Sequence, residues 1–210
     1  MYRASKPLFL LFAVTLVGAS LGKEAGTPSP EAPEYTADAQ LKLPQNYREW
    51  VYLTSDYYDA VSGPSQMQTA GQRKFNNIFV NPEAYRAFLE TGMWPDKTML
   101  VVEQRAADDI GSPNPKQKGA VQSSQIGLAL HVKDEARFPG KWAFFGFPGG
   151  SATAKMIPVT AGCYSCHATR GATDTTFVQF YPTLLPVAKS RNTLSSSYLQ
   201  KLETPSSTAK

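Results

Sequence analysis

The clearest chemistry in this sequence is carried by the stretch Cys163-Tyr164-Ser165-Cys166-His167. Cys-x-x-Cys-His is the pattern by which a c-type haem is attached, because two thiols separated by two residues can add across the two vinyl groups of one haem. The adjacent imidazole then becomes the proximal ligand of the iron. A chance occurrence and a thioredoxin-like dithiol are the alternatives. The motif predicts one covalent haem c, bound through Cys163 and Cys166, with His167 as the metal ligand.

Cysteine and histidine usage favours haem over other sites. The chain has two cysteines and two histidines, and the motif uses both cysteines, so no thiol is left for a disulfide framework. A zinc site would need the distant His131 as its fourth ligand, and His167 would directly adjoin a ligand cysteine, which suits a tetrahedron poorly. The motif is therefore better explained by haem than by zinc.

Residues 1–22 have the pattern of a secretory signal peptide. Arg3 and Lys6 precede an apolar run that ends in small residues, and these suit cleavage after Gly22. The run is shorter than the roughly 20 apolar residues of a transmembrane helix, although a retained N-terminal anchor is an alternative. We expect export to the periplasm and no membrane span after signal removal. Export agrees with the motif, since thioether attachment of haem takes place outside the bacterial cytoplasm.

Charge and composition exclude some partners and divide the mature chain. Loss of the signal peptide would lower the formal net charge from +4 and leave 19 basic and 17 acidic residues. No block of like charges or basic stripe occurs, so we expect no nucleic-acid partner. Residues 23–42 are rich in proline and are predicted to be a disordered linker. Residues 43–190 are the size of one domain, and residues 191–210 are assigned to a C-terminal tail.

Two helices are expected in the first half of this domain. Residues 43–51 should form a short packing helix with Tyr47, Trp50 and Val51 on one face. Residues 81–92 begin with Asn-Pro-Glu, which supplies an N-cap, a proline at the first helical position and an acid in the first turn. That segment ends at a glycine, and its apolar face should consist of Tyr85, Phe88 and Leu89.

Four segments have strand patterns. Residues 98–105 place Leu100 and Val102 on one face and Met99 and Val101 on the other, so this strand should be buried on both sides. The other strand segments are 75–80, 125–133 and the aromatic 140–147, and residues 62–72 and 106–119 have the composition of loops.

The order of these elements lacks strict alternation of strand and helix, which favours an α+β fold. We expect a single domain with a mostly antiparallel β-sheet, a few packing helices and a covalently attached haem. His131 points away from the apolar face of its strand, and we interpret it as a surface or hydrogen-bonded residue rather than a second iron ligand. No methionine follows His167 in the sequence, unlike in small all-helical electron carriers, which use a downstream methionine as sixth ligand.

Several stretches, in the order in which they stand here, resemble the cytochrome P-460 family of periplasmic c-type haem proteins and its relative cytochrome c′-beta. The resemblance implies a mostly antiparallel sheet, a homodimer, and a haem whose distal side is open or capped by pocket residues. The matching stretches are Leu43-Pro44-Gln45-Asn46-Tyr47-Arg48-Glu49-Trp50-Val51, Val80-Asn81-Pro82-Glu83-Ala84-Tyr85 with Thr91-Gly92, Val132-Lys133-Asp134 with Arg137-Phe138, Trp142-Ala143-Phe144, the Cys163 to His167 motif, and Phe180-Tyr181-Pro182.

The sequence departs from this family where the chemistry lies. In the P-460 enzymes, as the resemblance implies, a lysine forms a further covalent bond to the porphyrin and the haem oxidises hydroxylamine. The position matching that lysine is Val102, and the position matching a distal arginine is Asn76. Residues 151–162 contain no Asp or Glu that could act as a pocket acid. Proton removal from hydroxylamine needs a positioned base, so these departures weigh against that reaction.

We therefore expect five-coordinate haem iron with an apolar distal pocket, lined by Leu100 and Val102, that binds nitric oxide or carbon monoxide. One alternative is an oxidoreductase acting on hydroxylamine, nitric oxide or peroxide, for which no catalytic residue is assigned. Another is an electron carrier with a redox partner protein, which would favour a fixed sixth ligand. The candidate sixth ligands are Met67, Met93, Met99, Met156 and His131.

Overall fold

The computed structural model describes residues 31–58, 73–109 and 119–203. Its centre is a five-stranded sheet in the order β2-β3-β4-β5-β6, in which each strand pairs antiparallel with the next one along the chain. A two-stranded sheet pairs β1 with β7. This arrangement confirms the expected α+β class. The strand bounds are β1 Leu41–Lys42, β2 Val51–Tyr58, β3 Lys74–Val80, β4 Met99–Asp108, β5 Val121–Lys133, β6 Trp142–Gly146 and β7 Thr153–Ala154.

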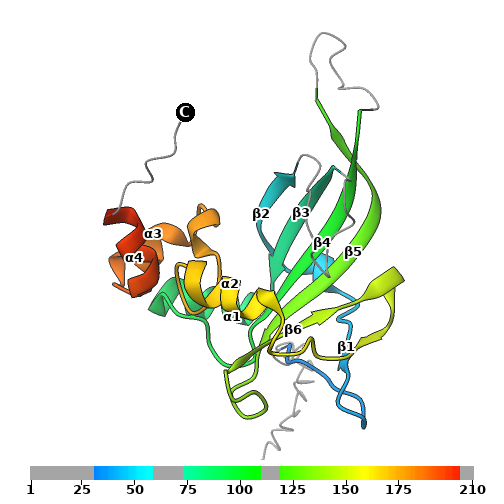
Figure 1. Cartoon of the computed structure of the whole chain (residues 1–210), viewed down its shortest axis with the longest axis horizontal. Helices are drawn as coiled ribbons and strands as arrows, with labels where there is room; N and C mark the ends of the chain where they lie inside the picture. The colour runs from blue at the N-terminus through cyan, green and yellow to red at the C-terminus, as the bar shows by residue number, and fades with distance from the viewer. Residues whose placement is uncertain (1–30, 59–72, 110–118, 204–210) are drawn as a thin grey trace, which may run out of the picture.

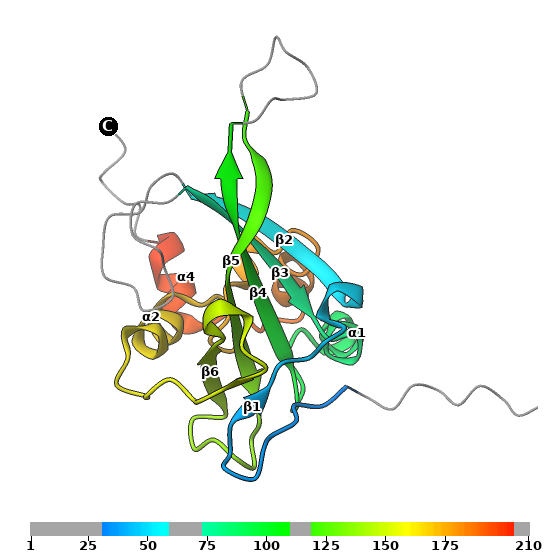
Figure 2. The same ribbon diagram turned by 90° about the vertical axis from the view of Figure 1, so that its right-hand side faces the viewer.

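The α-helices gather on one side of the central sheet, and β1 lies on the other (Figure 1). Figure 2, seen from the side of β1, shows that strand in front of the central strands. The helices are α1 Pro82–Thr91, α2 Gly162–Arg170, α3 Leu185–Ser190 and α4 Ser196–Glu203, and the 3-10 turns are η1 Tyr47–Glu49, η2 Pro148–Gly150 and η3 Val178–Phe180.

Both faces of the central sheet carry buried apolar clusters, and β4 contributes to each. Met99 and Val101 belong to the cluster that includes residues of β1 and β7. Leu100 belongs to the cluster that includes residues of α1 and α3, and Val102 packs against that cluster. The expectation that residues 98–105 form a strand buried on both sides is confirmed, and the strands expected at 75–80, 125–133 and 140–147 are present.

The helix expected at residues 81–92 is confirmed as α1, with a proline in its first turn and Gly92 in the left-handed conformation at its end. Two details differ from the expectation. The side chain of Asn81 makes no capping bond within the helix, because its Oδ1 accepts the Met99 backbone N–H at 2.8 Å and ties the helix start to β4. Phe88 is buried, whereas Leu89 is 40% exposed and does not belong to the packed face.

The prediction of a helix at residues 43–51 is wrong. Only the 3-10 turn η1 forms there, and β2 begins directly afterwards at Val51. Tyr47 and Trp50 are buried in the cluster on the β1 side, while Val51 packs against the cluster on the helical side. The three residues therefore cover two faces of the sheet rather than one face of a helix.

The expected domain limits also differ from the structure at both ends. Within the segment 23–42, described from residue 31 onward, Leu41 is fully buried and pairs with Ala154, so this part of the expected linker belongs to the folded domain. Within the expected tail 191–210, α4 forms a helix. The loop predicted at 62–72 lies outside the described residues, and of the loop predicted at 106–119 the first residues extend β4. No helix of the described residues is long and apolar enough to cross a membrane.

Candidate haem site

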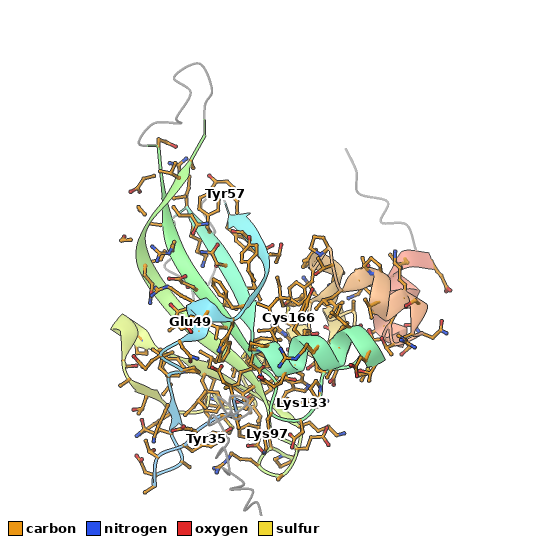
Figure 3. The ribbon with its side chains drawn as sticks, turned by 180° about the vertical axis from the view of Figure 1, so that it is seen from behind. Tyr35, Glu49, Tyr57, Lys97, Lys133 and Cys166 are labelled. Atoms are coloured by element: carbon orange, nitrogen blue, oxygen red, sulfur yellow. The ribbon has the colours of Figure 1, made fainter. Side chains whose placement is uncertain are left out.

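The Cys-x-x-Cys-His motif forms most of helix α2. Helical spacing of three and four residues places Cys163, Cys166 and His167 on neighbouring positions of one side of the helix. Both cysteines are free and half-buried, and burial is the main cause that raises the pKa of the Cys163 thiol. Figure 3 shows Cys166 between the central sheet and the helices. Two thiols and one imidazole thus lie on one side of a single helix, which is compatible with their binding one haem.

A cavity of about 1000 Å³ opens beside the motif, between the sheet and the segments α2, η3 and α4. Its volume is at the upper end of the roughly 300–1,000 Å³ that is usual for small-molecule and cofactor sites. The lining residues are Asp56, Tyr58, Asn76, Ile78, Leu100, Val102, Gln104 and His131 from the strands, Cys166, His167 and Arg170 from α2, and Thr176, Phe177, Gln179, Phe180, Tyr181, Tyr198 and Lys201 from the segments that follow.

The residues expected to surround a haem are brought together at this cavity. Leu100 and Val102, which the alternation of β4 placed on one face, line it together with Cys166 and His167. Asn76, which the sequence analysis expected at the place of a distal arginine, lines it as well. Cys163 is half-buried but is not among the lining residues, although it occupies the same side of α2.

The environment of His167 suits an iron ligand. Its Nδ1 lies 2.9 Å from the carbonyl oxygen of Thr175, and because a carbonyl only accepts hydrogen bonds, Nδ1 carries the proton. Nε2 is then the nitrogen with a free lone pair. Burial lowers the pKa of the ring, which favours the neutral form that binds metals. Histidines that bind metals commonly donate their other ring N–H in this way, so the residues present fit a haem iron at Nε2.

The interpretation of His131 as a surface or hydrogen-bonded residue is wrong. It does point away from the apolar face of β5, but the face it occupies is the covered one that bears the cavity, and only 5% of the residue is exposed. Its ring stacks on Phe144 with centroids 4.0 Å apart and meets His167 edge-on at 4.9 Å. Its Nε2 is buried and without a hydrogen-bond partner. Burial, followed by the nearby His167, lowers its pKa and keeps it neutral.

The contact between the two histidines argues against His131 as a sixth ligand. Two imidazoles bound to opposite sides of one metal, each at a metal–nitrogen distance of about 2.0 Å, have centroids roughly 6 Å apart. The observed 4.9 Å is too short for a metal between them. His131 therefore packs beside His167, and its ring contacts fill the space between β5 and α2.

None of the described methionines lines the large cavity. Met99 is buried in the cluster on the opposite face of the sheet, and Met93 lies at the surface after α1. Met156 lines a separate cavity of about 680 Å³, which His167 and His131 also line. Met67 lies outside the described residues. The described part of the chain thus offers no thioether to the cavity that holds Cys166.

The sequence analysis missed a row of polar side chains across the sheet. Asp56 on β2 pairs with Asn76 on β3, which pairs with Gln104 on β4, and all three line the cavity. Burial raises the pKa of Asp56, and the Asp56 charge adds to burial in raising the pKa of Tyr58. A pocket acid is therefore present on β2 and not in residues 151–162. Recognition of residues 51–58 as a strand would have revealed it, since Thr54, Asp56 and Tyr58 alternate along that strand.

Comparison with known proteins agrees with this geometry. The family model for cytochrome P460 matches residues 44–178, a span that contains the central sheet, α1 and the Cys-x-x-Cys-His helix. A comparison with curated proteins gives no match. The matched span covers more than half of the chain, and it includes Cys166, His167 and the strand residues that line the cavity. The chain therefore belongs to the cytochrome P460 family, whose members are c-type cytochromes that bind haem.

Proposed function

We propose that this chain is an exported c-type cytochrome with one haem, attached through Cys163 and Cys166, that binds a small ligand such as nitric oxide at iron whose one protein ligand is His167. The supporting observation is the cavity beside α2, which is lined by Cys166 and His167 from the helix and by Leu100 and Val102 from the sheet. A haem bound there would supply a redox-active iron that binds diatomic gases. The resemblance further implies a homodimer.

The chain's own residues would then have separate tasks. The Thr175 carbonyl oxygen accepts a hydrogen bond from Nδ1–H of His167, and this leaves Nε2 of His167 free to bind the iron. The strand residues Leu100 and Val102 give the cavity an apolar stretch of wall, and an apolar surface favours contact with a neutral gas over a charged ligand. Arg170 and Lys201 line the same cavity and offer positive charge to the two carboxylates that every haem carries.

Covalent attachment can be tested by mass spectrometry of the acid-denatured periplasmic protein. We expect the mass of the chain from Lys23 onward plus one haem, and peptides in which the haem is linked to Cys163 and Cys166 alone. Val102 has no nitrogen with which to attack the porphyrin, and Lys97 is paired with Asp134 and does not line the cavity. Extraction of free haem into acidified organic solvent, or a haem-linked peptide that contains Lys201, would contradict this expectation.

The open coordination position can be tested by the optical spectrum of the reduced protein with and without carbon monoxide. We expect a high-spin c-type spectrum that changes on addition of carbon monoxide or nitric oxide. A Val102→Thr variant keeps the size of the side chain but replaces one methyl group with a hydroxyl, so it is a matched probe of the apolar wall. If the reduced protein is already low-spin and does not respond to carbon monoxide, the chain is an electron carrier with a fixed sixth ligand.

Asp56 favours a second candidate function, that of an oxidoreductase acting on hydroxylamine or nitric oxide. A carboxyl whose pKa is raised by burial and which lines the cavity can take up a proton from a bound substrate. In this case Asp56→Asn should lower hydroxylamine turnover by about 100-fold or more, the usual contribution of a general base. Asp108→Asn is the matched control, because Asp108 is half-buried in β4 outside the cavity. Absence of turnover in the unchanged protein would dismiss this candidate.

A further inference from the structure

The carbonyl that accepts the His167 proton belongs to an unusual turn. Thr173 and Thr176 bond to each other through their backbones, and the two residues between them have positive φ, 47° at Asp174 and 57° at Thr175. Such a turn normally contains Asn, Asp or Gly at these positions, so Thr175 is the unusual residue. For a β-branched residue like Thr175 a positive φ is a strained conformation, and it persists only where the surroundings hold it in place.

Two side chains from the central sheet hold this turn through Asp174. Lys133 Nζ, on β5, donates to Asp174 Oδ2 at 2.7 Å, and Trp142 Nε1, on β6, donates to Oδ1 at 3.1 Å. The side chains of Lys133 and Asp174 are only 6% and 14% exposed, so water screens their interaction weakly. Each carboxylate oxygen thus has its own donor from the sheet. Through Asp174 the turn is anchored on β5 and β6, in addition to the bonds between Thr173 and Thr176 within its own segment.

The turn also packs directly against the end of the haem-binding helix. A Cβ atom at Gly171 would lie 2.7 Å from the His167 carbonyl oxygen and 2.9 Å from the Thr176 backbone nitrogen, so only glycine allows this approach. The close approach places the Thr175 carbonyl 2.9 Å from His167 Nδ1. Sheet, turn and helix α2 therefore form one continuous series of contacts that ends on the imidazole.

We propose that Asp174, held by Lys133 and Trp142, is a positioning residue for His167: it fixes the Thr175 carbonyl so that His167 keeps one tautomer and donates a strong Nδ1–H hydrogen bond. This inference rests on the proposed function, in which His167 Nε2 binds the iron. A strong bond from Nδ1–H to a carbonyl increases the basicity of Nε2, and a more basic ligand stabilises ferric over ferrous iron. Lys133, Trp142 and Asp174 thereby set how strongly His167 binds the iron and how easily the iron is reduced.

The test uses the haem-loaded full chain and two variants that act on different bonds. Asp174→Asn keeps an oxygen for one donor but turns an NH2 group toward the other, and Trp142→Phe removes one donor while keeping an aromatic ring. Glu103→Gln is the matched control: the Glu103 side chain is 3% exposed, pairs with Arg48 at 2.6 Å, and lies on β4 away from the turn. The measurements are the iron–histidine stretching band in resonance Raman spectra of the ferrous protein and the reduction potential.

We expect Asp174→Asn to lower the frequency of the iron–histidine band and to shift the equilibrium toward ferrous protein by about tenfold, which is about 59 mV for a one-electron couple. Trp142→Phe should shift both values in the same direction by less, and it carries the test if the Asp174 variant does not load haem. Glu103→Gln should leave both values unchanged.

Two results would overturn the inference while the proposed function stands. The band and the potential could remain at their original values in both test variants, in which case the turn does not need this anchor. The control could shift as far as the test variants, in which case the effect is general destabilisation. If the ferrous form of the unchanged protein shows no iron–histidine band, it does not hold five-coordinate iron on His167, and the proposed function fails together with this inference.

Discussion

Replacement of Lys133 by methionine should destabilise the protein strongly, because it leaves the Asp174 carboxylate buried with Trp142 as its remaining sheet donor. Lys133 Nζ also donates to the Trp94 carbonyl at 2.7 Å, so a second buried acceptor loses its partner. Removal of one member of a buried ion pair typically costs about 3–5 kcal/mol of unfolding free energy. With 6% and 14% exposure of the two side chains, we expect Lys133→Met to fall within this range.

The assay is urea unfolding of the haem-loaded full chain. Slopes of about 1–3 kcal/mol per molar urea translate this loss into a fall of the midpoint by more than about 1 M. Arg86→Met is the matched control, since the Arg86–Glu83 pair is 65% and 34% exposed and should change the free energy by no more than about 0.5 kcal/mol. The double variant Lys133→Met, Asp174→Leu should recover the part of the loss that comes from the unpaired carboxylate, while the Trp94 carbonyl stays without its donor. A loss below about 1 kcal/mol for Lys133→Met would refute the reasoning.

Two further predictions follow from the same contacts. Burial raises the pKa of Asp56 above its ordinary value of 3.8, so the folded protein binds more protons than the unfolded chain between the two pKa values, and the unfolding free energy falls as pH rises through that interval. Asn cannot titrate, so the unfolding free energy of Asp56→Asn should increase relative to that of the unchanged protein as the pH rises from about 3 to about 7. A difference in unfolding free energy that stays constant over this range would contradict this. Gly171→Ala should cost about 1–3 kcal/mol or prevent haem loading, because the new methyl group would lie 2.9 Å from the Thr175 carbonyl carbon, and an unchanged melting temperature would show that the turn can move.

The shared position of the Cys-x-x-Cys-His residues on one helix could be predicted from the sequence because it depends on spacing alone. Cys163, Cys166 and His167 need only one helical turn to meet, and α2 provides it. The position of Leu100 and Val102 could be predicted for a similar reason: β4 is regular where they stand, so alternation identifies their shared face. Periodicity thus predicts the positions of a set of residues reliably when all of them lie on one regular helix or strand.

Strand β2 and its acid could not be predicted in the same way. The pairing of β2 with β3 shifts in register between Tyr52 and Thr54, so the alternation of side chains is interrupted in the middle of the strand. Tyr52 and Tyr57 are large apolar residues on the exposed side, which hides the contrast between the two faces. Without the strand, nothing in the sequence placed Asp56 beside Asn76.

His131 shows a different limit of periodicity. The alternation of β5 correctly separates Leu128 and Leu130 from His131, but it does not reveal what covers the second face. In an antiparallel sheet with one face in water, His131 would have been a surface residue. Here α2 covers that face, and the histidine is enclosed between Phe144 and His167.

The conformation of the turn at Asp174 and Thr175 could not be predicted from the residues of the turn themselves. Asp174 tolerates a positive φ, but a β-branched threonine opposes it, so the local propensity of Thr175 predicts some other conformation. The turn forms because Lys133 and Trp142, about forty and thirty residues earlier, supply donors for both oxygens of Asp174. Strain of this kind is retained where it places a functional group, and in this protein the group it places is the carbonyl that orients His167.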